Sequence, residues 1–132
     1  MNIEQLRAKR RAYNKKTGYA AYHKYEKTPN GFLMRMHHNM HERVSGIQKK
    51  KHHLYAGIKL IPREEFYVWA KASPKFWELY DVWKASGYNR KLTPTVDRVD
   101  PTKGYEIENM EWVTHSENSR RSSITRLRFN KI

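Results

Sequence analysis

Residues 92–118 read LTPTVDRVDPTKGYEIENMEWVTHSEN, and this stretch decides the fold that we expect. Its first part, 92–100, is rich in β-branched residues and partly alternates, which predicts a short strand. Residues 101–104 (PTKG) predict a turn, and residues 110–114 (MEWVT) alternate and predict a second strand. Thr114 and Glu117 fit a capping box, which predicts that a helix begins there. The expected order is therefore strand, loop, strand, helix.

The residues before this stretch predict helices. Residues 2–27 are rich in Arg, Lys, Tyr and Ala, which indicates a basic helix or arm broken at Gly18, with a solvated tail as the alternative. Thr28 and Pro29 predict the start of a helix over 29–45, where apolar residues recur at four-residue spacing. Two further helices are predicted to begin at Pro62 and at Ser73, the residue that we expect to cap the second of them. Their many aromatic side chains are expected to form the core.

These elements predict an α+β fold in one compact domain, with a helical N-terminal part followed by the strand–strand–helix motif. We expect a basic arm at 1–27 and a helical part with a basic connector at 28–91. The motif itself is expected at 92–122, and a basic tail at 123–132.

The net charge is +14 with His neutral, from 27 Lys and Arg against 13 Asp and Glu. Ten of the 13 acidic residues fall within 61–118, so two basic flanks enclose the segment that carries most of the acid. A charge of this size predicts a polyanionic partner, and nucleic acid is the usual one. A membrane surface would require a basic amphipathic helix with a clear apolar face, and none stands out. We therefore expect nucleic acid as partner and no membrane.

The sequence has no cysteine, which excludes disulfides, thiol catalysis and a zinc–cysteine site. No apolar run approaches the roughly 20 residues that cross a bilayer. Residues 1–11 lack the apolar stretch of a signal peptide. We therefore expect a protein that is not secreted and remains in the cytoplasm where it is made.

Several spaced pieces of residues 92–122 resemble the ββα-metal motif of stand-alone HNH endonucleases, especially those that phages carry. The pieces are DRVD at 97–100, KGY at 103–105, NMEWV at 109–113 and EN at 117–118. Residues 28–46 also resemble the helical segment that often precedes the motif in phage members. The resemblance implies double-stranded DNA as partner and an enzyme that hydrolyses it with Mg²⁺, or Mn²⁺, and nicks one strand per site. It would act in the host cytoplasm if a phage encodes it, as a monomer, with a dimer left open.

Such a site needs a hard divalent cation with oxygen ligands. Asp97 on the first strand supplies a carboxylate, and Asn118 near the start of the helix supplies an amide oxygen that faces it. Two protein ligands leave room for waters and a phosphate oxygen. Asn109 matches the Asn that braces the loop in this family. Gly104 is expected to allow a tight loop, and Trp112 to pack under the helix.

The residue after the expected metal ligand is Arg98, where most of the family has the His that activates water. Arginine stays protonated and has no acceptor, so it is not expected to serve as the base. Two interpretations follow: Arg98 clamps the scissile phosphate, or the protein binds DNA through a degenerate HNH fold without cutting it. His115, three residues before Asn118 on one helix face, is the nearest replacement base. The histidines at 37, 38 and 41 are alternatives from outside the motif.

Basic side chains around the metal pair are expected to contact DNA phosphates. They are Arg43, Lys49, Lys50, Lys51, Arg98, Arg120 and Arg121. Phosphate contacts carry no base code, so they predict no target sequence. A basic RNA-binding protein is a third hypothesis, but it leaves the spacing of Asp97 and Asn118 without a purpose.

Overall fold

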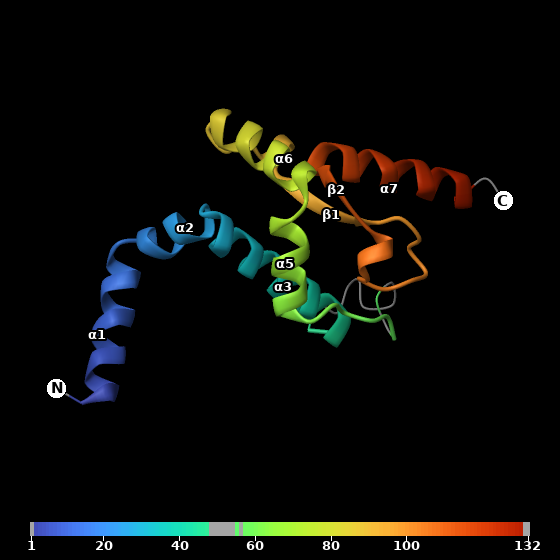
Figure 1. The fold of residues 1–132 in the computed structure, drawn as a ribbon. Coiled ribbons are helices and arrows are strands. Elements are labelled where there is room, and N and C mark those ends of the chain that lie inside the picture. Colours follow the sequence, from blue (N-terminus) through green and yellow to red (C-terminus); the bar gives the residue numbers. More distant parts are fainter. Residues whose placement is uncertain (1, 48–54, 56, 131–132) are drawn as a thin grey trace. The chain divides into compact units, whose positions relative to one another are not determined.

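The computed structural model describes residues 2–47, 55 and 57–130, and side chains as far as residue 124. Within these residues the fold is α+β and mostly helical, with six α-helices and one two-stranded antiparallel sheet (Figure 1). The predicted α+β class is confirmed. The chain divides into two compact units, 1–39 and 40–132, so the boundary lies inside a helix and not after residue 27. None of the described helices is long and apolar enough to span a bilayer.

The first unit contains α1 (Ile3–Lys16), α2 (Ala20–Glu26) and the first part of α3 (Pro29–Ser45). The break between α1 and α2 falls where Gly18 and Tyr19 have φ angles of 65° and 61°. Gly18 therefore ends the first helix as predicted, because glycine adopts this left-handed conformation without steric cost. Neither α1 nor α2 buries a residue. The basic arm is thus a pair of exposed helices.

The start of α3 is fixed by contacts within the first unit. The Thr28 hydroxyl donates to the carbonyl oxygen of Tyr25 at 2.6 Å and accepts from the backbone N–H of Gly31 at 3.2 Å. Thr28 therefore caps α3 as predicted. A Cβ on Gly31 would lie 1.9 Å from the Tyr25 carbonyl oxygen, so only glycine fits at this position.

The second unit contains the remaining helices and the sheet. In chain order they are α5 (Arg63–Lys71), α6 (Pro74–Ala85), β1 (Pro94–Arg98), β2 (Met110–Thr114) and α7 (His115–Asn130). The sequence predicted each of them, although β1 begins two residues later than expected. Ser73 is the N-cap residue of α6 as predicted, but its hydroxyl makes no capping hydrogen bond and donates instead to the carbonyl oxygen of Trp69 at 2.7 Å.

The register of the sheet decides which side chains share a face. Asp97 lies opposite Glu111, and Val96 lies opposite Trp112. Because successive side chains of a strand point to opposite faces, Asp97 and Glu111 share one face and Trp112 lies on the other. Both α6 and α7 contact both strands. The face with Trp112 meets aromatic side chains of α5 and α6, and the face with Asp97 meets Arg121 of α7.

Trp112 lies in the aromatic core, with 3% of its surface exposed. Its ring stacks on Trp69 with 5.5 Å between centroids, and it lies 4.8 Å from Phe76 and 6.3 Å from Phe66. The aromatic residues predicted to form the core are thus found there. Trp112 packs on α5 and α6, not under α7 as the sequence analysis expected, because the register turns it away from the face of Glu111.

Gly104 lies where the loop between the strands meets the segment before α5. The Tyr105 N–H donates to the carbonyl oxygen of Lys59 at 2.8 Å, and Leu60 and Tyr105 form a parallel bridge. A Cβ on Gly104 would lie 2.5 Å from the Lys59 carbonyl oxygen. Glycine is therefore required here by the close approach of another segment, and not by the tight turn that the sequence predicted.

Candidate functional site

The Asp97 carboxylate is turned towards α7. Its Oδ2 accepts a hydrogen bond from Nη1 of Arg121 at 3.0 Å. The same nitrogen donates to Glu111 at 3.1 Å, and Nε of Arg121 donates to Glu117 at 3.1 Å. One guanidinium thus binds carboxylates from β1, β2 and α7. We call Asp97, Glu111, Glu117 and Arg121 the Arg121 cluster.

Asn118, the second predicted metal ligand, lies three residues before Arg121 on α7. Residues three apart share a helix face, so Asn118 lies on the face from which Arg121 reaches Asp97. Its side chain is partly buried. The structure therefore shows Asp97 paired with Arg121, a residue that shares its helix face with Asn118.

The donor atoms fit a hard divalent cation in kind, because a carboxylate and an amide oxygen are ligands that Mg²⁺ prefers. Among the described residues, no group of three or more His, Asp or Glu is placed to hold a metal ion. A cation at Asp97 and Asn118 would therefore take most of its ligands from water and phosphate. It would also have to replace Arg121 as the partner of Asp97.

The hydrogen bonds of the Arg121 cluster favour the charged forms of Glu117 and Arg121. Hydrogen bonds from Arg120, and next from Arg121, lower the pKa of Glu117 from 4.5 to about 2. Hydrogen bonds to Glu111, Asp97 and Glu117 raise the pKa of Arg121 above its ordinary value. Arg121 therefore carries its positive charge between these carboxylates at neutral pH.

Arg98 serves the loop between the strands. Its Nη1 donates to the carbonyl oxygens of Pro101 and Lys103 at 2.9 and 3.1 Å. Its guanidinium lies 4.5 Å from the ring centre of Tyr55. Because neighbouring strand residues point to opposite faces, Arg98 is turned away from Asp97. This placement runs against the interpretation that Arg98 clamps a phosphate at the Asp97 carboxylate.

Asn109 is the buried polar centre of the same loop, with 6% of its surface exposed. Its Oδ1 accepts from the backbone N–H of Asp100 at 2.8 Å. Its Nδ2 donates to the carbonyl oxygens of Asp100 at 3.0 Å and Gly104 at 2.9 Å. The bracing hydrogen bonds expected of Asn109 are present. They fix the loop that follows the strand carrying Asp97.

Asp100 lies directly before the predicted turn at 101–104. Its Oδ1 accepts from the hydroxyl of Thr102 at 2.6 Å and from the backbone N–H of the same residue at 2.9 Å. These two bonds, the hydroxyl first, lower the pKa of Asp100 from its ordinary value of 3.8. A carboxyl with a lowered pKa stabilises the fold above its ordinary pKa and loses that contribution as the pH falls through the lowered value.

We therefore expect Thr102→Val to raise the pKa of Asp100 towards 3.8, because the strongest of its donors is removed. The variant should therefore lose less stability through Asp100 as the pH falls below 3.8. NMR titration of the Asp100 carboxyl measures the change. Thr93→Val is the matched control, since that hydroxyl donates to the Arg90 carbonyl oxygen. An unchanged Asp100 titration in Thr102→Val would contradict this account.

The start of α7 differs from the predicted capping box. The Thr114 hydroxyl accepts from the backbone N–H of Glu117 at 3.1 Å, which is half of the box. The Glu117 carboxylate instead accepts from Arg120 and Arg121. His115, the candidate base, is the first residue of the helix, and its backbone N–H donates to the Thr93 carbonyl oxygen at 2.8 Å. The helix begins where predicted, but only half of the capping box forms.

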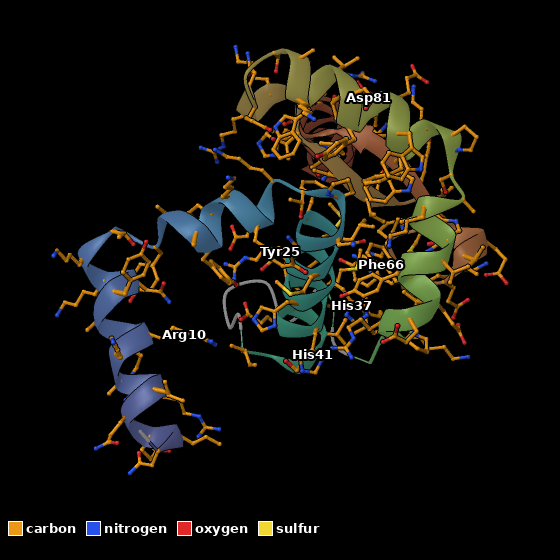
Figure 2. The ribbon with its side chains drawn as sticks, turned by 60° about the vertical axis from the view of Figure 1, so that its left-hand side comes forward. Arg10, Tyr25, His37, His41, Phe66 and Asp81 are labelled. Carbon is orange, nitrogen blue, oxygen red and sulfur yellow. The ribbon has the colours of Figure 1, made fainter. Side chains whose placement is uncertain are left out.

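Among the described residues, those predicted to contact DNA have partners within the protein. Arg43 hydrogen-bonds the Tyr105 side chain, whose pKa is raised by burial. Arg120 is exposed and donates twice to Glu117, at 2.9 and 2.6 Å. Lys49, Lys50 and Lys51 lie outside the described residues. The histidines at 37, 38 and 41 lie on α3, where Figure 2 labels two of them.

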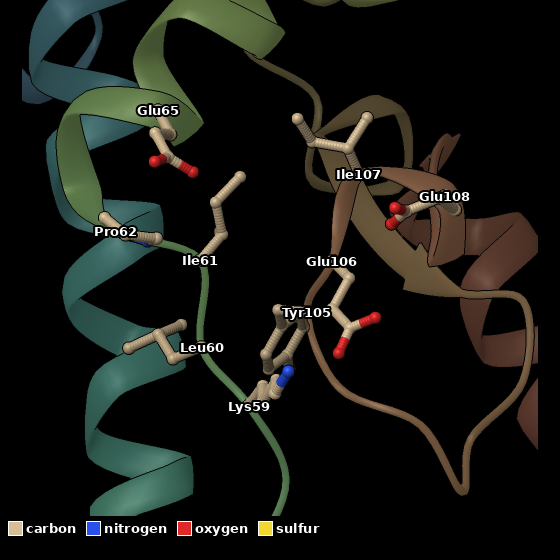
Figure 3. A pocket seen from close by; sticks show the side chains of 9 residues that line it. All are labelled: Lys59, Leu60, Ile61, Pro62, Glu65, Tyr105, Glu106, Ile107 and Glu108. Carbon is tan, nitrogen blue, oxygen red and sulfur yellow. The ribbon is translucent and has the colours of Figure 1, made fainter.

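An open pocket of about 330 Å³ lies elsewhere in the second unit. It is lined by residues 59–62, Glu65 and 105–108, and three of its side chains are glutamates (Figure 3). No residue predicted for the metal or phosphate site lines it. The pocket is therefore separate from the Arg121 cluster.

Sequence reasoning missed Glu111 and the pairing of Arg121. Glu111 reaches the cluster because the register sets it opposite Asp97, and no local pattern encodes that pairing. Alternation in residues 110–114 does indicate that Glu111 lies on the face opposite Trp112. If Trp112 is buried in the core, this alternation places Glu111 on the opposite face of the sheet.

Comparison with known proteins gives no relative on which to base a function. No family model, no curated protein and no solved structure matches this chain. The function is therefore inferred from the residues of the two strands, the loop between them and α7, whose Arg121 pairs with Asp97.

Proposed function

We propose that this chain is a metal-dependent HNH endonuclease that hydrolyses DNA, with residues 92–122 as its ββα-metal unit and Mg²⁺ or Mn²⁺ as cofactor. One observation carries the proposal: the Asp97 carboxylate on β1 pairs with Arg121 of α7, which lies on the same helix face as Asn118. A carboxylate and an amide oxygen from two elements are suited to share one hard cation.

The residues of the chain then have distinct roles. The cation would be held by Asp97 and Asn118, and when bound it supplies positive charge at the reacting phosphate. Asn109 positions the loop by its hydrogen bonds to Asp100 and Gly104. His115, on the helix face of Asn118, is the candidate to take a proton from the attacking water. One such site cuts one strand, so a monomer would nick.

The exposed arm supports DNA as the substrate. Residues 1–27 contain eight Lys and Arg against two Asp and Glu, a net charge of +6. Because α1 and α2 bury no residue, their basic side chains are available to phosphates. Such contacts release counterions from DNA, and the affinity then falls as salt rises.

We expect Arg10→Gln with Arg11→Gln to weaken DNA binding and to reduce its salt dependence. Each lost phosphate contact should lower the slope of log affinity against log salt by about 0.9. Both arginines are exposed on α1, where Figure 2 labels Arg10. The control, Lys75→Gln with Lys84→Gln, removes the same charge from α6. Equal losses in the two double variants would show that affinity follows net charge and not the arm.

A plasmid-nicking assay tests the proposed activity. Purified protein with Mg²⁺ or Mn²⁺ should convert supercoiled plasmid into open circles, and EDTA should prevent the conversion. Supercoiled plasmid that stays intact with either metal, under conditions in which the protein binds it, would exclude the enzyme.

That outcome would favour a second candidate, a non-cleaving DNA-binding protein with a degenerate HNH fold. One observation supports it: the ion pair with Arg121 already neutralises the Asp97 carboxylate. Competition between duplex DNA and structured RNA separates either candidate from an RNA-binding protein. Tighter binding of the RNA would contradict both.

A further inference from the structure

In the Arg121 cluster, carboxylates of three elements surround one guanidinium. Three carboxylates from three elements lie at 3.0 to 3.1 Å from nitrogens of one guanidinium. Nη1 is shared by Asp97 and Glu111, which lie directly opposite each other on the sheet. Like charges in that position repel each other, so a cation between them stabilises the pair. Arg121 supplies that cation in the structure.

The guanidinium is held by contacts that can exchange. The side chain of Arg121 is 37% exposed, and those of Asp97 and Glu111 are 22% and 48% exposed. Ion pairs this accessible to water are weak, because solvent screens them and ordering long side chains costs entropy. The same exposure gives ions from solution access to the Asp97 carboxylate.

We propose that Arg121 occupies the cation position beside Asp97 in the metal-free protein, so that a divalent cation binds there only when the guanidinium leaves. The inference rests on the proposed function, because it concerns the metal site assigned to Asp97. It assigns to Arg121 a competing role that differs from a phosphate contact. Arg121 then raises the metal concentration at which the site fills, because each cation that binds must displace one positive charge.

Binding of Mn²⁺ alone, without DNA, tests the competition. The electron paramagnetic resonance signal of free Mn²⁺ gives the affinity of each variant. Arg121→Gln removes the competing charge and keeps hydrogen-bonding capacity, so we expect Mn²⁺ to bind on the order of tenfold tighter. Arg120→Gln is the matched control, since Arg120 pairs with Glu117 and not with Asp97. It should change the affinity much less. Adding Asp97→Asn to Arg121→Gln should remove the gain.

Three results would overturn the inference: equal gains in the two single variants, an unchanged affinity in Arg121→Gln, or no Mn²⁺ bound by Arg121→Gln. Circular dichroism checks that the variants fold. If Arg121→Gln does not fold, Arg121→Met removes the same charge with an unbranched side chain, and a gain in the same direction is expected; no gain there overturns the inference too.

The inference and the proposed function fail in different ways. If the unmodified protein nicks plasmid with Mn²⁺ while Arg121→Gln binds Mn²⁺ no tighter, the function stands and the competition is wrong. If Arg121→Gln gains Mn²⁺ binding through Asp97 but the unmodified protein does not nick plasmid, the competition stands and the proposed endonuclease activity is wrong.

Discussion

Asp97→Asn is expected to reduce metal-dependent nicking by at least about 100-fold, because the cation loses the one carboxylate that the proposed site provides. The amide has the shape of the carboxylate and can still meet Arg121, so the fold should persist. DNA affinity should stay nearly unchanged, since Asp97 carries a negative charge and its loss removes no phosphate contact. Nicking rates at saturating plasmid, together with separate measurements of DNA binding, distinguish the two effects.

Asp81→Asn is the matched control for this prediction. Asp81 is exposed on α6 (Figure 2), so the same chemical change there removes the same charge away from the cluster. It should leave nicking at the level of the unmodified protein. Wild-type nicking by Asp97→Asn would show that the metal site is misassigned. Asn118→Ala addresses the second ligand with the same assay.

The local elements of the fold were predictable because their signals are local. Thr28 begins α3 and Gly18 ends α1, since a cap and a helix break depend on residues within one turn. The alternation around Val96 and Trp112 likewise predicted both strands. Where the structure differs, the cause is a contact between segments distant in the sequence. Gly104 is an example, because its requirement comes from the backbone of Lys59.

The candidate site was harder to predict because it depends on which face each side chain takes. Asp97 and Arg98 are neighbours in sequence, and the phosphate-clamp interpretation treated them as neighbours in space. Alternation along β1 separates them, so Arg98 binds the loop carbonyls while Asp97 meets α7. Glu111, from the other strand, lies opposite Asp97 and shares the Arg121 guanidinium with it, whereas Arg98 does not. Strand register, which no short motif encodes, made that difference.

The loop between the strands connects the stability of the fold to the site, and Asn109 is its most sensitive residue. We expect Asn109→Ala to lower the free energy of unfolding by about 2–4 kcal/mol, because it leaves three backbone groups without their buried partner. Two of these groups belong to Asp100 and the third is the Gly104 carbonyl oxygen. Urea unfolding measures the change. Asn89→Ala is the control, since Asn89 is exposed and accepts one bond from Lys91.

The size of the Asn109→Ala effect shows which side chain holds the loop. Arg98 also binds this loop, through the carbonyl oxygens of Pro101 and Lys103. A loss no larger than that of Asn89→Ala would mean that Arg98 holds the loop without Asn109. A large loss, with nicking reduced at temperatures where the variant remains folded, would mean that Asn109 also fixes the strand register. Asp97 faces Glu111 and α7 only in that register, so the metal site would then depend on a residue that does not touch the metal.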